Sequence, residues 1–103
     1  MTTTNPGTNI PLPRAAVFGD IWEGDDDTVH RVIMGDNRGI TDSDVIVWTS
    51  AIQFWDGSID TGNEVELPAV HIDGDVSRLS RDQALELVAA LVDAVAEVAV
   101  WTP

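Results

Sequence analysis

The chain has no cysteine, no lysine and no tyrosine among its 103 residues. Without cysteine it can form no disulfide, no thiolate nucleophile and no cysteine-ligated zinc site. Without lysine it cannot supply the lysine of a phosphate-binding loop, and no glycine-rich run leads into a helix. Several classes of enzyme and nucleotide-binding site are therefore excluded by composition alone.

Positive charge is scarce. Five arginines stand against 18 aspartates and glutamates, which gives a formal net charge of -13. Because carboxylates and phosphates repel each other, direct binding to nucleic acid is disfavoured, and a protein partner with a basic surface is favoured. The hydrophobic fraction of 44% is that of a folded protein.

A long uninterrupted apolar run is also missing. The most apolar segment, residues 84–101, contains Glu86, Asp93 and Glu97, and these charges argue against a membrane span. The stretch "MTTTNPGTNIPLPR" has no basic region followed by an apolar one. We therefore expect no secretory signal and a cytoplasmic location.

The length fits one domain with one modest core. Residues 1–13 are threonine, asparagine, glycine and proline with few aliphatic side chains, which predicts a disordered tail. Residues 14–103 are expected to form a single domain. A docking peptide built on "IPLP" is the alternative interpretation of the tail.

Three segments predict strands. Branched residues in "TVHRVIM", residues 28–34, lead into the turn "GDNRG", and "LPAVHID", residues 67–73, predicts a later strand. Between them, residues 44–54 alternate, with Ile46, Trp48, Ile52 and Phe54 on one face and Val47, Thr49, Ala51 and Gln53 on the other. We expect the first set to be core, and a bend or bulge near residues 49–51, because the segment exceeds the usual strand length.

The last segment predicts a helix of about twenty residues. Ser80 and Gln83 form a capping box, Asp82 lies in the first turn, and no glycine or proline follows until Pro103. Strands followed by one helix predict an α+β domain. Its antiparallel sheet should have roughly three to five short strands, with the C-terminal helix packed across it.

This helix is apolar over more of its surface than one sheet can cover. Its acids fall on one stripe, and its larger aliphatic side chains form two seams: Leu85, Val88, Val92 and Val95, and then Leu87, Leu91 and Val98. The apolar surface that the sheet cannot cover predicts a homodimer formed through the helix. Burial of both seams by a curved sheet is the alternative. Expected interface residues are Leu85, Val88, Val92, Val95 and Val98, with the tryptophans Trp55 and Trp101.

The stretch "HIDGD" raises the question of a metal site. On an extended strand His71, Asp73 and Asp75 project from one face and could offer an imidazole and two carboxylates to a divalent cation. The competing interpretation is a strand end, with Val70 and Ile72 pointing inward and their neighbours facing water. We favour the strand end and expect neither a metal nor a cofactor. No catalytic motif is recognisable, so we expect a protein that is not an enzyme.

The ending "LSRDQALELVAALVDAVAEVAVW", after the strand "AVHID", resembles the carboxyl-terminal pattern of small uncharacterised proteins from actinobacteria and their bacteriophages. In that group a few strands lead through leucine, serine or threonine, two residues and glutamine into one alanine-rich helix. The resemblance covers residues 69–103 and, more loosely, "SAIQFWDG". It implies a strand-then-helix fold and an actinobacterial, phage or prophage origin, and it brings no activity with it.

The sequence thus predicts a non-catalytic, acidic accessory or regulatory protein that acts by binding another protein. Two alternatives stay open. One is a DNA mimic, whose carboxylates would imitate a row of phosphates in a basic cleft. The other is a metal-dependent hydrolase using His71, Asp73 and Asp75.

Overall fold

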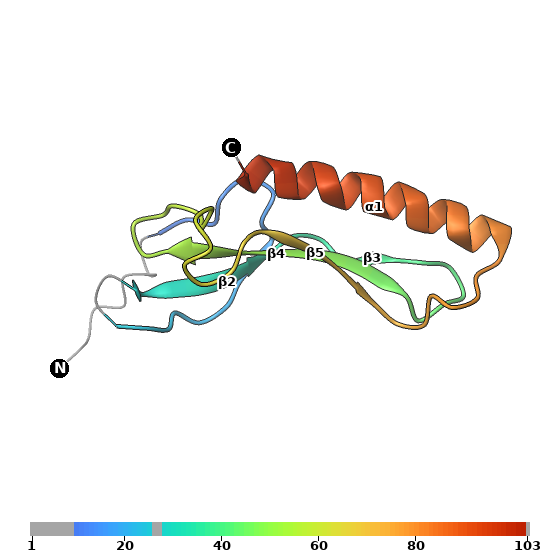
Figure 1. The fold of residues 1–103 in the computed structure, drawn as a ribbon, viewed down its shortest axis with the longest axis horizontal. Helices are drawn as coiled ribbons and strands as arrows, with labels where there is room; N and C mark the ends of the chain where they lie inside the picture. The colour runs from blue at the N-terminus through green and yellow to red at the C-terminus, as the bar shows by residue number, and fades with distance from the viewer. Residues whose placement is uncertain (1–9, 26–27, 103) are drawn as a thin grey trace.

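A computed structural model describes residues 10–25 and 28–102, which form a sheet of five short strands and one C-terminal helix (Figure 1). In chain order the elements are β1 (Phe18–Gly19), β2 (His30–Met34), β3 (Arg38–Gly39), β4 (Ile46–Phe54), β5 (Ala69–Asp73) and α1 (Arg81–Trp101). The helix lies lengthwise over one face of the sheet. The predicted α+β fold, a small antiparallel sheet with one C-terminal helix, is confirmed. Nowhere in residues 10–25 and 28–102 is a helix long and apolar enough to cross a membrane.

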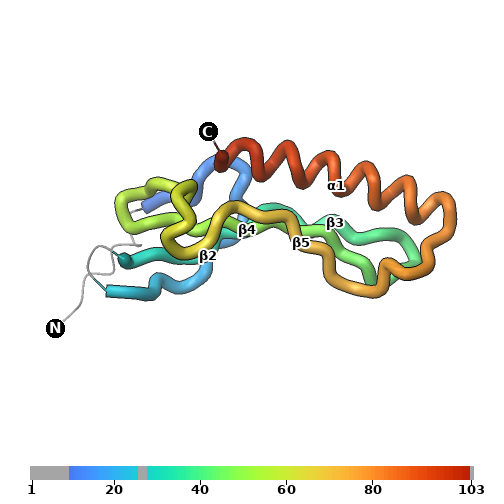
Figure 2. Tube along the Cα trace, in the orientation of Figure 1, coloured from blue at the N-terminus to red at the C-terminus, as the bar shows by residue number. Residues whose placement is uncertain are grey.

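Strand β4 is the centre of the sheet. β2 and β3 pair with one edge of β4, β5 pairs with the other edge, and β1 lies beyond β2, with every pairing antiparallel. Figure 2 shows that the helix runs along the long direction of this sheet and ends near the segment that precedes β1. The helix packs on β4 and β5 and also binds Arg38 of β3, so it reaches both sides of the central strand.

The register contains a bulge between β2 and β3. Met34 lies opposite Ser50 and Arg38 lies opposite Val47, so the three residues 35–37 stand opposite the two residues 48–49. One extra residue on one strand is the definition of a bulge, and it increases the local twist. A bulge on β4 near residues 49–51 is thus wrong: β4 pairs without interruption there, and its partner strand carries the extra residue. A bend of β4 at these residues, the other form expected, stays a prediction.

The more polar face of β4 lies on the α1 side. Val47 and Thr49 are 0% exposed, and Ala51 and Gln53 are 2% exposed. On the opposite face Ile46 is 38% exposed, and Trp48 and Phe54 are half-buried, although Ile52 is buried at 2%. The prediction that Ile46, Trp48 and Phe54 are core is therefore wrong, and only Ile52 behaves as expected.

Hydrogen bonds explain why polar residues occupy the covered face. The side-chain oxygen Oε1 of Gln53 accepts from Arg31 Nε at 2.8 Å, and the Thr49 hydroxyl donates to Glu97 on the helix. Among the described residues, no buried side-chain nitrogen or oxygen atom lacks a hydrogen-bond partner. A buried polar group that has a partner avoids most of the cost of leaving water, so the apolar face of a strand need not be the covered one.

The helix begins at the predicted capping box. Gln83 N donates to Ser80 Oγ at 3.1 Å, and Ser80 N donates to Gln83 Oε1 at 2.9 Å. The Gln83 amide also donates to the carbonyls of Thr41 and Asp42. The same residue therefore caps the helix and attaches its first turn to the loop after β3.

The other end of the helix is fixed by Trp101. This side chain is 3% exposed and packs with Ile33 and Ala51 in the core, while its Nε1 donates to the Arg14 carbonyl at 2.8 Å. Val98 is half-buried beside this cluster. Val98 and Trp101, expected at an intersubunit interface, are thus used inside the protomer, because they point to the sheet.

Part of the predicted tail contacts the sheet. The Ile10 carbonyl accepts from Arg31 Nη2 at 3.0 Å, and the Pro11 carbonyl accepts from Gln53 Nε2 at 3.1 Å. The prediction for residues 1–9 lies outside the described residues. For residues 10–13 the structure extends the packed domain beyond its predicted start at Arg14.

Candidate functional site

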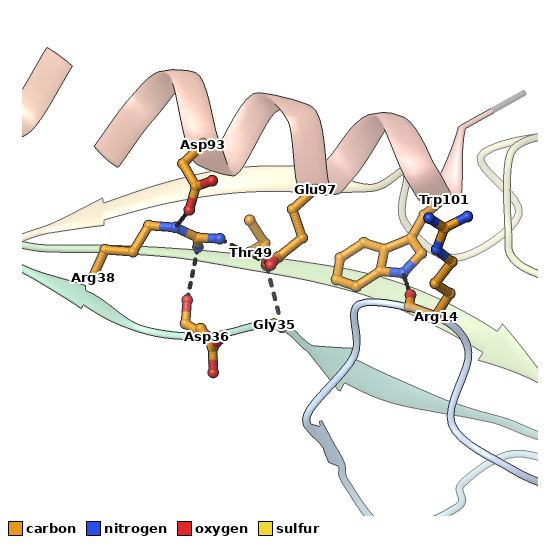
Figure 3. A network of polar contacts seen from close by, with 8 residues as sticks. All are labelled: Arg14, Gly35, Asp36, Arg38, Thr49, Asp93, Glu97 and Trp101. Atoms are coloured by element: carbon orange, nitrogen blue, oxygen red, sulfur yellow. Dashed lines mark hydrogen bonds and ion pairs between the residues drawn. The ribbon is translucent and has the colours of Figure 1, made fainter. Parts of the chain in front are cut away.

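The acidic residues Glu86, Asp93 and Glu97 lie on the side of α1 that faces β3 and the loop after it. We call the contact of Asp93 and Glu97 with Arg38 the polar anchor (Figure 3). Arg38 donates from Nε to Asp93 and from Nη2 to Glu97, each at 2.8 Å. Burial by itself would lower the pKa of Arg38, but the hydrogen bonds and negative charges of Asp93 and Glu97 outweigh it and raise that pKa above its ordinary value. Farther along this side of α1, Glu86 accepts from Thr41 Oγ1 at 2.8 Å. These carboxylates therefore serve to dock the helix.

The polar anchor depends on Gly35, the first residue of the bulge. Glu97 and the Thr49 hydroxyl lie beside Gly35 (Figure 3). A Cβ atom added to Gly35 would collide with Glu97 Oε1. Gly35 N donates to Thr49 Oγ1 at 3.2 Å. A glycine is required at this position because the helix carboxylate occupies the place of a side chain.

The face of α1 that points away from the sheet is apolar and exposed. Leu85, Val88, Val92 and Val95 are 57 to 66% exposed, and they are interleaved with exposed alanines at 84, 89, 96 and 99. We call these eight residues the outer apolar stripe. At 100° per residue they span one continuous side of the helix, which carries no charge from residue 84 to residue 99; Arg81, in the first turn, lies on the same side. Exposed aliphatic side chains of ordinary surfaces are scattered instead.

Trp55, the remaining expected interface residue, lies in the turn after β4 and is 45% exposed. It is not part of the outer apolar stripe. Of the seven residues expected at an interface, four lie on the outer apolar stripe. Val98 and Trp101 lie on the side of the helix that packs on the sheet, and Trp55 lies outside the helix.

Only two of the three candidate metal ligands lie on one face of a strand. His71 and Asp73 lie on the same face of β5, as alternation predicts, but Gly74 has φ of 99° and turns the chain before Asp75. The Asp75 carboxylate accepts from Ser77 N at 2.9 Å. In the part of the chain that the structure describes, no three histidine, aspartate or glutamate side chains are grouped as a metal site.

His71 and Asp73 instead belong to a cluster around Trp48 on the open face of the sheet, opposite α1. The His71 ring stacks on Trp48 with centroids 3.9 Å apart and an interplanar angle of 12°. Trp48 Nε1 donates to Asp73 Oδ2 at 2.8 Å, and His71 Nε2 lies 2.7 Å from Ser50 Oγ. A serine–histidine hydrogen bond is one element of a nucleophile–base pair, but Ser50 is 4% exposed and its oxygen is little accessible to a substrate.

A hollow of about 260 Å³ opens beside this cluster. It is lined by Met34, Asn37, Ile46, Trp48 and Asp73. We call it the Trp48 hollow. The hollow cannot be seen in the sequence, because Met34, just before the bulge, and Asn37, within it, reach Trp48 only through the pairing of β2 and β3 with β4.

Comparison of the chain with protein-family models, with curated proteins and with solved structures finds no match. What the protein does must therefore be inferred from its own surfaces.

Proposed function

We propose that the chain is a non-catalytic accessory or regulatory protein that acts by binding other proteins, and that it works as a homodimer formed through α1. The cytoplasmic location and the phage or prophage origin expected from the sequence belong to the same proposal. The observation that carries it is the outer apolar stripe, since a helix that is already packed on a sheet has no need of a second apolar side.

The stripe is large enough to support weak to moderate self-association. A helix of 21 residues is about 31 Å long at about 1.5 Å per residue. In a symmetric pair the four large aliphatic side chains of each stripe leave water together. Because the contact is confined to one side of one helix, we expect a dissociation constant in the micromolar range rather than a permanent dimer.

Charge placement is compatible with pairing through this surface. The exposed acid Asp93 lies on the β3 flank, where it pairs with Arg38, and no acid lies on the stripe itself. The two stripes can therefore meet without placing unpaired carboxylates in the contact. Each protomer still carries -13, so the pair should be strengthened by added salt.

Sedimentation velocity tests the dimer. The wild type should show a concentration-dependent dimer across the micromolar range, and Val92→Arg should be monomeric, because it places an unpaired charge in the contact. Ile21→Arg is the matched control: Ile21 is 76% exposed and lies outside α1, so this variant should dimerise like the wild type. Circular dichroism verifies that both variants are folded. A wild type that stays monomeric at high micromolar concentration contradicts the proposal.

The two other functions considered from the sequence have less support. A phosphate mimic would need its carboxylates free, yet Glu86, Asp93 and Glu97 contact Thr41 and Arg38. A hydrolase using His71, Asp73 and Asp75 would need these residues together, and Gly74 turns Asp75 away from the strand alternation.

A further inference from the structure

We propose that the Trp48 hollow binds the side chain of a lysine or arginine that a partner polypeptide presents to the open face of the sheet. This inference deepens the proposed function, on which it rests, by naming the chemistry of the partner. It concerns the face of the sheet opposite α1, so it does not depend on the dimer.

The lining of the hollow suits an alkyl chain that ends in a positive charge. Met34 and Ile46 supply apolar walls, Trp48 supplies an aromatic surface, and Asp73 supplies a carboxylate. Long cationic side chains bury their methylene stems on apolar surface and keep the charged group at a polar rim. A cation near both an indole and a carboxylate is attracted by each.

The carboxylate is held in place for this role. Asp73 Oδ2 accepts from Trp48 Nε1 at 2.8 Å, and Asp73 is exposed. Among the described residues its second oxygen, Oδ1, accepts no hydrogen bond, so it can accept one from a ligand. Because Asp73 and Trp48 orient each other, a cation would meet a preformed acceptor and lose little affinity to ordering.

The indole ring is held as well. His71 stacks against Trp48 at 3.9 Å and is itself hydrogen-bonded to Ser50. The ring therefore has two partners on β5, the His71 ring and the Asp73 carboxylate, and these contacts favour one orientation of the indole. A rigid aromatic wall is what distinguishes a site from a transient gap between mobile side chains.

The surroundings indicate a polypeptide rather than a free amino acid or amine. Phe18 lies opposite Met34 in the sheet and therefore on the same face, where it is 51% exposed; Ile46 is 38% exposed. A free amino acid covers the hollow only, whereas a peptide with apolar neighbours beside its lysine or arginine also covers these side chains. The net charge of -13 attracts a basic segment and repels an acidic one.

The experiment is an NMR titration of the ¹⁵N-labelled full chain, which follows the indole N–H signal of Trp48. The probes are three blocked peptides with leucines flanking a central lysine, arginine or norleucine. Norleucine keeps the apolar stem of lysine and lacks the charge. The lysine and arginine peptides should shift the Trp48 signal in a saturable way. The norleucine peptide should bind at least about tenfold more weakly, because it lacks one charge-assisted hydrogen bond.

Asp73→Asn and Asp75→Asn form the matched pair of variants, because they remove the same charge two positions apart. Asp73→Asn should reduce binding of the cationic peptides to the norleucine level, while its amide oxygen can still accept from Trp48. Asp75→Asn should bind like the wild type. An equal loss of peptide affinity in both variants would mean diffuse attraction to an acidic surface. Equal affinity for the norleucine and lysine peptides would mean that the hollow is only an apolar patch. Either result overturns the cation site.

The outcome is separable from that of the dimer. Val92→Arg lies on the opposite side of the molecule and should bind the lysine peptide with unchanged affinity. A monomeric wild type that binds the lysine peptide refutes the dimer alone. A dimer in which no peptide shifts the Trp48 signal refutes the cation site alone.

Discussion

Asp60 is the clearest case of one residue that organises a segment. It is 1% exposed, and its Oδ1 accepts from the backbone N–H groups of Gly62 and Glu64 while Oδ2 accepts from those of Val65 and Glu66, at 2.7 to 3.1 Å. Burial opposes ionisation of this carboxyl, but the four N–H donors outweigh burial and hold its pKa below the ordinary value. The ionised form of Asp60 therefore stabilises the loop between β4 and β5.

Asp60→Asn should destabilise the fold by about 2 kcal/mol, because the amide NH₂ would face two backbone donors in place of an acceptor. Since the folded-state pKa of Asp60 is depressed, its contribution is present above the unfolded-state pKa and is lost as pH falls through the folded-state value. Urea unfolding at several pH values should show the gap between wild type and variant closing on acidification. Asp36→Asn, which removes an exposed carboxylate, is the control and should leave stability nearly unchanged. A gap that is constant with pH would contradict the assignment.

Gly35 and Gly39 form a matched pair for the bulge. Gly35→Ala should cost about 1 to 3 kcal/mol, because its Cβ would collide with Glu97 and displace that carboxylate from Thr49. Gly39→Ala has nothing within 4 Å of the added Cβ and should change stability little. Thermal melts of the two variants decide the matter, and similar melting temperatures would show that Glu97 is not held beside the bulge.

At the scale of the element, α1 is where local sequence carries most information. Ser80 and Gln83 are three positions apart, so their capping box depends only on neighbours in the chain and is confirmed. The faces of β4 could not be predicted in this way. Thr49 and Gln53 are buried because Glu97 and Arg31, far away in sequence, supply hydrogen bonds. Alternation identifies two faces, and only tertiary partners decide which one is covered.

The candidate site shows the same division. The shared face of His71 and Asp73 follows from strand alternation, which ends at Gly74, where the positive φ turns the chain before Asp75. The hollow beside Trp48 could not be predicted, since a register shift of one residue between β2 and β3 decides which side chains line it.

The two carboxylates that bind Arg38 should differ in energetic weight. Glu97→Ala should cost about 2 to 3 kcal/mol, because its side chain is 11% exposed and its loss leaves Thr49 and part of Arg38 without a buried acceptor. Asp93→Ala should cost less than about 1 kcal/mol, because that side chain is 72% exposed and its ion pair is screened by water. Chemical denaturation of both variants measures the difference. Equal costs would mean that the anchor acts through net charge and not through burial.

At the scale of the whole molecule, charge opposes folding. If every arginine were paired with one acid, a net charge of -13 would remain, and folding brings these charges closer together. Sodium chloride should therefore raise the melting temperature as the Debye length falls from about 10 Å at about 0.1 M to about 3 Å at about 1 M. Sodium sulfate is unsuitable, because it also strengthens apolar burial. A melting temperature that is flat or falls with sodium chloride would show that repulsion is unimportant.

The bond between Trp101 and the Arg14 carbonyl, which spans 87 positions, also has a consequence for the order of events in the cell. Ile33 and Ala51 are synthesised early, yet the core that they form with Trp101 cannot close until residue 101 has left the ribosome. Contacts of such long sequence separation slow folding, because most of the chain must be ordered before they form. The strands can pair during translation, and the helix is locked onto them only after synthesis has passed its last turn.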